Sequence, residues 1–450
     1  SNLNEPSKNK FYFISCRMKN SKNYPLNDKR TITGWAFFDW ANSAYALTIA
    51  VAIFPNYYNT ITDGEIYTIF GFDLTNTALY SFALSFAYLL VSILSPYLSG
   101  IADFSGKKLR FMKFFTYLGS ISCMMLFFFY SAEDVVWAIS FFILATVGFA
   151  GGLVFYNSFL PDIASEDQYD KVSAKGFSYG YFGSVLLLIV NLIIIMFPET
   201  FGLDPDGTLQ YRIAFAMVGL WWFGFSFIPF NRLPQDRQGP SPANLFRKSI
   251  DKLKRTLKKV QQAPSIKRFL LAFFFYSAGV QTILLLATLF ATSQLNFKTA
   301  DLIGVILLLQ FLAIAGAYIF AMLSDKKGNK FALIFMLFIW ISICIIAYFV
   351  TTAAQFYGVA AGVGLVMGGI QSLSRSTYSK LLPRDTPDTT SYFSFYDVLE
   401  KYSVVIGTFI FGIIDQLFGM RNSVLALTVF FAIGIIALMT LKIKPAPVED

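Results

Sequence analysis

Long apolar stretches, separated by short polar loops, follow one another along almost the whole chain. A stretch of about 18 or more apolar residues can cross the hydrocarbon core of a bilayer, which is roughly 30 Å thick. Because a lipid-exposed backbone must satisfy its own hydrogen bonds, each stretch is expected to be a helix. The pattern predicts an all-α membrane protein with twelve transmembrane helices, which begin near Gly34, Ala78, Phe111, Val135, Val172, Tyr211, Phe269, Leu302, Phe331, Gln355, Tyr392 and Val424.

The longest polar connection follows the sixth stretch, so we expect two bundles of six helices each. The predicted organisation is a tail at 1–33, a first bundle at 34–230, a linker at 231–267, a second bundle at 268–441 and a tail at 442–450. Within the linker, residues 243–262 are predicted to form an amphipathic helix, with Phe246, Ile250, Leu253, Leu257 and Val260 on one face and Lys and Arg on the others. This helix either lies on an anionic membrane leaflet or is a solvated basic linker.

The composition supports a membrane protein and excludes several kinds of chemistry. Of the 450 residues, 56% are hydrophobic and only 14% are charged, whereas a soluble domain has roughly 25% charged residues. The chain has no histidine, which excludes His-ligated metals, His-dependent triads and imidazole proton relays. Cys16, Cys123 and Cys344 lie far apart, so we expect neither a disulfide framework nor a zinc site. We therefore expect no metal, no cofactor and no enzymatic activity.

The net charge of +9 is explained by membrane topology. When the amino terminus is placed in the cytoplasm, all but four of the 36 Lys and Arg residues fall on the cytoplasmic side. Arg212, Lys298 and Arg421 fall on the opposite side, and Lys401 falls within a helix. Both termini are therefore predicted to be cytoplasmic, since positive charge accumulates on that side. The basic balance predicts contact with membrane lipids and no binding of nucleic acid.

An internal repeat relates the two predicted bundles. Asp103 and Gly106 of the loop after the second helix recur as Asp325 and Gly328 after the eighth helix, 222 residues later. The Pro161 that ends the fourth helix recurs as Pro383 at the same offset. Two unrelated motifs that share one period predict parallel structural repeats, an arrangement found in two-bundle transporters.

The repeated loop is a candidate gate. Its first copy contains Gly100, Asp103, Gly106, Lys107 and Lys108, and its second copy contains Asp325 and Gly328. Glycine permits close approach of helices, and Asp can cap a helix amino terminus, so such a loop could form and break contacts between bundles. The alternative is a simple positive loop on the cytoplasmic side.

The first copy resembles the signature loop of the major facilitator superfamily. The second copy has Met322 where the first has Gly100, so it lacks the leading glycine of that signature. The first copy is not a phosphate-binding loop, because five residues separate its glycines and no Ser or Thr follows the lysines. Without an ATP site, transport would be secondary.

Three further stretches resemble the vacuole-effluxer (autophagy-related protein 22-like) permease family of that superfamily. They are Gly34 to Tyr45, which contains Asp-Trp-Ala-Asn-Ser-Ala-Tyr, Val154 to Asp162, and Gly368 to Ser376. The resemblance implies the twelve-helix facilitator fold, and fungal members of the family are linked to amino-acid efflux from the vacuole. Phe38 stands where a tyrosine is usual, and Ser277-Ala278 stand where relatives often have Asn-Asp. The chain therefore lacks the acid that would be a candidate cation or proton site in the seventh helix.

Ionisable residues inside a membrane span are costly and mark candidate functional sites. Asp39, in the first helix with Trp40, Asn42 and Tyr45, is a candidate for binding a substrate amino group or a proton. The alternative is a structural residue at the helix end. In the eleventh helix, Asp397 and Lys401 are spaced i, i+4 beside Glu400 and form either a coupling switch or an ordinary pair in the headgroup region.

Four further residues complete the candidate site. Asn157, Gln281 and Gln371 lie on helices that line the cavity in the facilitator fold, and their amides suit a polar cargo or bonds between helices. Arg375 either attracts an anionic group at the inner gate or extends towards the headgroups.

The sequence therefore predicts a secondary transporter that moves a small polar metabolite, such as an amino acid, by alternating access. Without histidine, proton coupling would require carboxylates: Asp39, Asp397 or Glu400. A lipid or lysolipid flippase of the same fold, or a non-transporting receptor or scaffold, are the alternatives. We expect a bacterial inner membrane, because the loops are compact and Asn-x-Ser/Thr sites are absent. We also expect a monomer.

Overall fold

The computed structural model of the protein describes residues 25–442, apart from residues 70, 238–244, 296, 298 and 385. In its first half, α2 (Lys29–Ala44) continues through the π-helical η2 (Tyr45–Ile53) into α3 (Phe54–Ile61). The long helices that follow are α4 (Asn76–Ser105), α5 (Lys108–Met125), α6 (Val135–Ser158), α8 (Tyr169–Met196) and α9 (Leu209–Arg232). The short elements are β1 (Ile66–Ile69), β2 (Phe72–Thr75), α7 (Leu160–Ile163), η3 (Leu126–Phe128), η4 (Ala132–Asp134), η5 (Glu166–Gln168) and η6 (Pro198–Phe201). The two strands pair antiparallel, with Ile66 opposite Thr75.

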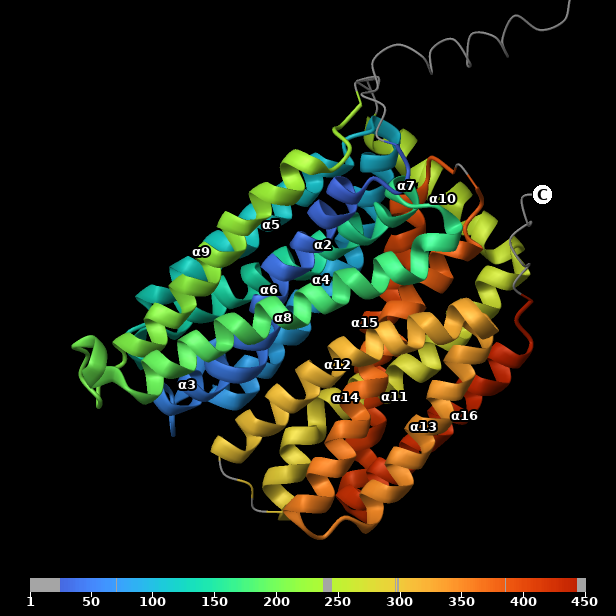
Figure 1. The fold of residues 1–450 in the computed structure, drawn as a ribbon. Coiled ribbons are helices and arrows are strands. Elements are labelled where there is room, and N and C mark those ends of the chain that lie inside the picture. Colours follow the sequence, from blue (N-terminus) through green and yellow to red (C-terminus); the bar gives the residue numbers. More distant parts are fainter. Residues whose placement is uncertain are drawn as a thin grey trace, which may run out of the picture.

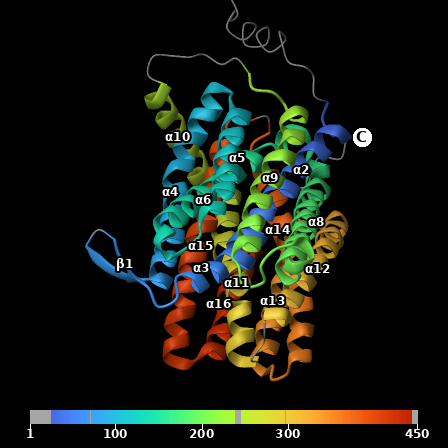
Figure 2. The same cartoon turned by 90° about the vertical axis from the view of Figure 1, so that its left-hand side faces the viewer.

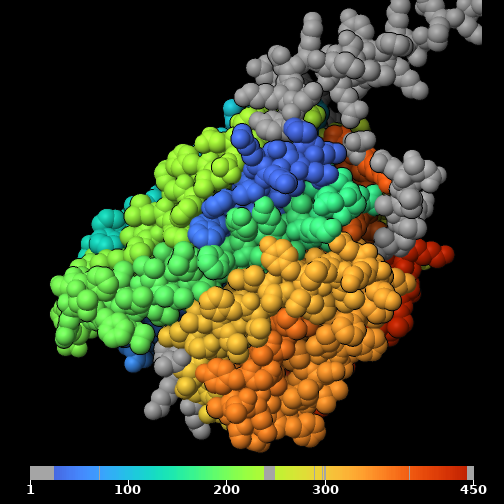
Figure 3. Space-filling view, viewed as in Figure 1, coloured from blue at the N-terminus to red at the C-terminus, as the bar shows by residue number. Residues whose placement is uncertain are grey.

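The second half begins after the linker helix α10 (Leu245–Gln262). It comprises α11 (Pro264–Leu295), α12 (Thr299–Lys327), α13 (Asn329–Phe349), α14 (Ala353–Leu381), α15 (Thr389–Phe418) and α16 (Met420–Met439). Each half forms its own bundle, and the two bundles stand side by side, from blue to green and from yellow to red in Figure 1. Helices α8 and α12 meet along the seam between them, which is visible in Figure 3.

The start of α2 and the end of α16 lie at the same end of the molecule (Figure 2), which we call the terminal end. Helix α2 begins at Lys29, five residues before the predicted start at Gly34. The reason is a side-chain cap: the Asp28 carboxylate accepts hydrogen bonds from the hydroxyl and the amide of Thr31, both at 2.8 Å. These bonds also lower the pKa of Asp28. Asp39 therefore lies ten residues, or about 15 Å, inside the helix.

Eleven helices in the described part of the chain are long and apolar enough to cross a membrane, by length and composition alone. Helix α15 occupies the position of the predicted eleventh span but is not among them, and it carries Asp397, Glu400 and Lys401 in its first half. Its 30 residues extend over about 45 Å, and it packs beside α4, α11 and α16. The predicted count of twelve spans stays a prediction for this helix.

Glycine residues permit the closest helix contacts. A Cβ atom on Gly368 of α14 would lie 1.9 Å from the Ala313 carbonyl oxygen of α12, and one on Gly316 of α12 would lie 1.8 Å from the Leu365 carbonyl oxygen. In the first bundle, Gly176, Gly180 and Gly183 bring α8 against α2 in the same way. These contacts set the spacing of the helices that carry the buried polar residues described below.

Substituting Gly368 tests this packing. Gly368→Val should force α12 and α14 apart and lower the free energy of unfolding by about 1–3 kcal/mol, which is measurable as a lower thermal unfolding temperature of the purified protein. Gly358→Val on the same helix is the matched control, because a Cβ atom there meets nothing within 4 Å. Equal destabilisation by the two substitutions would contradict the packing argument.

Candidate functional site

Arg375 of α14 extends from the second bundle into the first. Its side chain is 2% exposed. Its Nε donates to the Ser173 hydroxyl and its Nη2 to the Ser173 carbonyl oxygen, both at 2.9 Å. Its Nη1 donates to Asn157 Oδ1 at 3.1 Å and to Asp39 Oδ2 at 3.4 Å. Residues of α2, α6 and α8 thus supply the hydrogen-bond acceptors for one buried guanidinium. We call the group of Arg375, Asp39, Asn157 and Ser173 the Arg375 junction.

Aromatic rings surround the guanidinium. Its central carbon lies 4.2 Å from the ring centre of Phe177, 4.6 Å from that of Trp35 and 5.4 Å from that of Tyr156. A desolvated cation over such rings gains electrostatic stabilisation. Tyr156 also donates its hydroxyl hydrogen to Asp39 Oδ2 at 2.7 Å. The buried carboxylate therefore has two donors.

Gly176 of α8 makes room for the junction. A Cβ atom there would lie 2.8 Å from the Trp35 ring and 2.9 Å from Arg375 Nη2. One on Gly180 would lie 3.3 Å from the Asp39 Cβ atom. A larger residue at either position would displace the groups that hold the ion pair.

The other predicted residues of the first helix lie apart from the junction. The Trp40 ring packs on Trp221 at 5.5 Å, on the side of α9. The Tyr45 hydroxyl shares a 2.6 Å hydrogen bond with Thr146. Asn42 is fully buried, and neither of its amide atoms has a hydrogen-bond partner in the described structure. A buried amide is expected to find a partner, and the described residues provide none for Asn42.

A second polar group, the Glu400 cluster, lies on α15 and α11. Gln281 donates to Glu400 at 3.2 Å, and Asp397 forms an ion pair with Lys401 in which both side chains are buried. Gln371 is elsewhere: its oxygen accepts a hydrogen bond from Tyr181 of α8, across the seam between the bundles.

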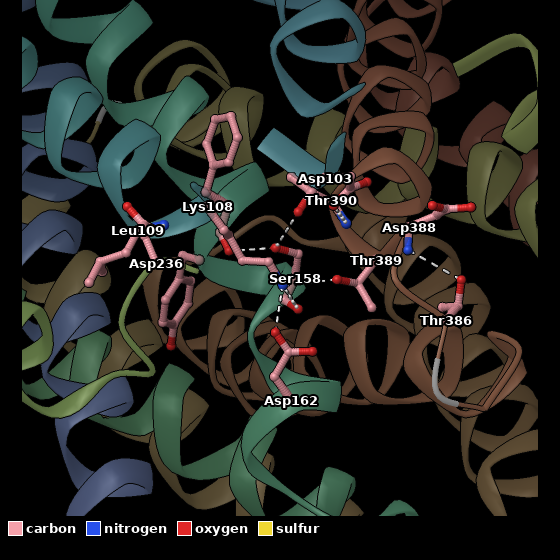
Figure 4. A network of polar contacts seen from close by, with 12 residues as sticks. Asp103, Lys108, Leu109, Ser158, Asp162, Asp236, Thr386, Asp388, Thr389 and Thr390 are labelled. Carbon is pink, nitrogen blue, oxygen red and sulfur yellow. Dashed lines mark hydrogen bonds and ion pairs between the residues drawn. The ribbon is translucent and has the colours of Figure 1, made fainter. Parts of the chain in front are cut away.

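A third group, the Asp103 cluster, joins the bundles at the terminal end (Figure 4). Asp103 of α4 accepts hydrogen bonds from the Ser391 amide and hydroxyl, both at 2.7 Å, and from the Thr390 amide at 3.2 Å. These amides belong to the first turn of α15, where a carboxylate is favoured by the unsatisfied N–H groups and the helix dipole. Lys108 donates to Asp162 at 2.7 Å and, across the seam, to Thr389 at 2.9 Å.

The neighbouring loop residues shape this cluster. Gly106 ends α4 in the left-handed conformation, with φ of 69°, and Lys107 directly precedes α5. Asp236 accepts the Leu109 amide at 2.8 Å and so caps α5. Gly100 contacts the linker helix, because a Cβ atom there would lie 2.9 Å from the Ser249 carbonyl oxygen.

The second copy of the loop also meets the first bundle. Asp325 pairs with Lys171 of α8 at 3.1 Å, and Gly328 has a φ of 85°. Beside this pair, buried Asp170 of α8 accepts hydrogen bonds from three residues of the second bundle: Ser324 at 2.9 Å, Asn329 at 2.8 Å and Lys380 at 2.6 Å. We call this group the Asp170 cluster.

Sequence reasoning missed Tyr156, Ser173, Asp170 and Lys380 as site residues. For Asp170 a signal existed, because it is an acid on the side of the protein where Lys and Arg accumulate, and such an acid is a natural partner for them. Tyr156 lies in the Val154 to Asp162 stretch, which does not by itself mark it as a site residue, and no signal in the sequence marks Ser173. The described residues contain no group of three or more His, Cys, Asp or Glu that could hold a metal ion.

The ion pair of the junction can be tested by a double-mutant cycle. Asp39→Asn or Arg375→Gln alone should lower the free energy of unfolding by about 3–5 kcal/mol, because each leaves one buried charge uncompensated. The double variant should recover part of this loss, as measured by thermal unfolding of the purified protein. Lys171→Gln with Asp325→Asn is the control cycle, because that exposed pair should contribute at most about 1 kcal/mol. Strictly additive losses at the junction would contradict the coupling.

Comparisons with known proteins identify the family. Residues 27–449 match the family model described as "Vacuole effluxer Atg22 like". The chain is 30% identical over 405 residues to an uncharacterised MFS-type transporter, YxiO, of Bacillus subtilis, covering 90% of this chain and 93% of that protein. It is 25% identical to autophagy-related protein 22-1 of Penicillium rubens over 81% of this chain and 75% of that protein.

Solved structures show the fold. The transporter FucP in its outward conformation matches with a TM-score of 0.70 at 13% identity, over 92% of this chain and 98% of that one. The human organic anion transporter MFSD10 matches with a TM-score of 0.71 at 11% identity, over 92% of this chain and the whole of that one. With the repeated loop and the two joined bundles, these matches show that the chain belongs to the vacuole-effluxer (Atg22-like) family of major facilitator transporters.

Proposed function

We propose that this transporter moves a free amino acid by alternating access and binds it at the Arg375 junction. The observation that carries the proposal is the buried pair of Asp39 and Arg375, whose partners come from different bundles. An amino acid carries one carboxylate and one ammonium group. The carboxylate suits the guanidinium fork of Arg375, and the ammonium suits Asp39.

The geometry of the pair supports exchange of partners. The 3.4 Å contact between Arg375 Nη1 and Asp39 Oδ2 is longer than the 2.7–2.9 Å of strong charge-assisted hydrogen bonds. A zwitterion that enters between the two side chains would replace one long contact by two short ones. The rings of Trp35 and Phe177 would then enclose its side chain, and Asn157 would supply a further polar contact.

Alternating access follows from where the bundles are joined. The Asp103 and Asp170 clusters both close the terminal end in this state. If that end is cytoplasmic, as the distribution of Lys and Arg indicates, the structure corresponds to a state that is closed towards the cytoplasm. Opening requires both clusters to break, so we assign them as the inner gate, with Gly100, Gly106 and Gly328 shaping its loops.

We propose protons as the coupling ion. The chain has no histidine, so the carrier must be a carboxylate. Protonated Asp39 would no longer hold Arg375, and protonated Glu400 would change its contact with Gln281. Either event alters contacts on which the closed state depends. We further propose a bacterial inner membrane as the location and a monomer as the working unit.

Movement of a lysolipid is the second candidate, and an apolar cavity favours it. The cavity has a volume of about 60 Å³ and lies within the second bundle, away from the terminal end. Its lining, which includes Phe290, Leu309, Cys344 and Val363, contains no charged side chain. Its apolar lining suits part of a hydrocarbon chain and offers no partner to the charges of a zwitterion.

Transport by the purified protein in proteoliposomes tests the proposal. Counterflow of at least one radiolabelled amino acid is expected, and Arg375→Gln should lower its rate by about tenfold or more, since one lost charge-assisted contact is worth ~1.5–3 kcal/mol. Lys171→Gln, which removes an exposed lysine, should leave the rate nearly unchanged. Failure of every amino acid would overturn the proposal, and movement of a fluorescent lysolipid instead would favour the second candidate.

The same vesicles test the coupling ion. A pH gradient should drive net uptake of the amino acid, and Glu400→Gln should abolish this drive while preserving counterflow, because exchange needs no net proton movement. Asp415→Asn, at the other end of α15, is the control. If the native protein takes up the amino acid at the same rate with and without the pH gradient, proton coupling is contradicted.

A further inference from the structure

The linker helix α10 lies across the closed terminal end. It packs against α4 of the first bundle and against α11 and α15 of the second. On α4 it approaches so closely that a Cβ atom on Gly100 would lie 2.9 Å from the Ser249 carbonyl oxygen. Ser249, Thr256 and Val260 are buried by these contacts. In this state α10 is therefore seated on the bundles.

Asp388 holds α10 to the second bundle. Its carboxylate, 7% exposed, pairs with Lys252 at 2.9 Å and with Lys259 at 3.1 Å, and it accepts a longer hydrogen bond from Thr256 at 3.4 Å. Burial raises the pKa of Asp388, but the two ammonium groups outweigh it and hold the pKa below its ordinary value. The carboxylate is thus charged at neutral pH, and it lies directly before the first turn of α15 that Asp103 binds (Figure 4).

Gate opening must disturb this arrangement. Helix α10 contacts Gly100 in one bundle and Asp388 in the other. Separation of α4 from α15 would pull these two positions apart, and a single rigid helix cannot follow both. Either the Asp388 pairs or the contact with α4 must break first.

The opposite face of α10 is basic and exposed. Lys254, Arg255 and Lys258 are exposed, and the helix carries seven Lys and Arg residues against one Asp. Leu257 is exposed beside them, so its predicted place on the apolar face is wrong; the buried face includes Ser249, Thr256 and Val260 instead. Anionic headgroups attract such a face, and Leu257 can enter the interface beside them. The attraction extends to Lys259, which is 56% exposed although it pairs with Asp388.

We propose that α10 is a clamp on the inner gate and that its exposed basic face is a docking surface for anionic lipid headgroups, which lift the clamp from Asp388. The proposal rests on the alternating-access part of the proposed function and is independent of the substrate. An anionic leaflet would favour opening of the gate, and a neutral one would keep α10 seated.

The seating of α10 can be measured without transport. Val260→Cys places a thiol on the buried face of the helix, in a Cys16→Ser background where Cys123 and Cys344 remain buried. The reaction rate with an uncharged maleimide is compared in nanodiscs of phosphatidylcholine alone and of phosphatidylcholine with one part in three of phosphatidylglycerol. We expect the anionic lipid to raise the rate by about fivefold or more. Gln261→Cys, exposed in the seated state, is the reference position, whose rate should change little.

Two variants test separately the contact that holds α10 on the bundles and the lipid binding that releases it. With Asp388→Asn, the thiol at position 260 should react fast in both lipids, because α10 has lost the carboxylate that holds it to the second bundle. Asp415→Asn should behave as the native protein. In the triple variant K254Q/R255Q/K258Q the thiol should react slowly in both lipids, because the docking surface has lost its charge while the ion pairs with Asp388 remain. Equal rates in the two lipids for the native chain, a slow Asp388→Asn variant, or an undiminished lipid response of the triple variant would each overturn the proposal.

Discussion

The burial of one guanidinium between two bundles is the constraint on which the rest of the structure depends. Arg375 is 2% exposed, so its N–H donors need acceptors within the protein and its charge needs a partner. Ser173, Asn157 and Asp39 provide both. These acceptors lie on three helices of the other bundle, so satisfying Arg375 fixes how the two bundles face one another. A substrate that satisfies Arg375 equally well would release that constraint.

The contacts at the terminal end follow the internal repeat, but not symmetrically. In the first copy, Asp103 binds the amino terminus of α15 directly. In the second copy, Asp325 makes an exposed pair, and the buried contact passes instead to Asp170 of α8. The linker helix strengthens only one of the two sides, through Asp388. The side that contains α4 and α15 is therefore the one on which α10 rests, whereas the side that contains α8 and α12 is held by the Asp170 cluster.

Much of the fold could be predicted from the sequence, because apolar length and the 222-residue period report directly on helices and repeats. The pairing of side chains could not. Asp39 and Arg375 were both candidates, yet nothing local connects residues 336 positions apart. Trp40 was grouped with Asp39, although neighbours on a helix point about 100° apart, and the structure places Trp40 against Trp221. The face of α10 that packs on the bundles could not be predicted either, since it includes the polar residues Ser249 and Thr256 and not only the apolar stripe.

The central claim is that Asp39 and Arg375 recognise the two charges of one substrate. Thermal stabilisation of the purified protein should be compared for a transported amino acid, the amine that lacks its carboxylate and the acid that lacks its ammonium group. The account predicts that only the zwitterion stabilises the native protein, that Arg375→Gln removes the preference for the carboxylate, and that Asp39→Asn removes the preference for the ammonium group. Equal stabilisation by all three compounds, or preferences that survive both substitutions, would contradict it.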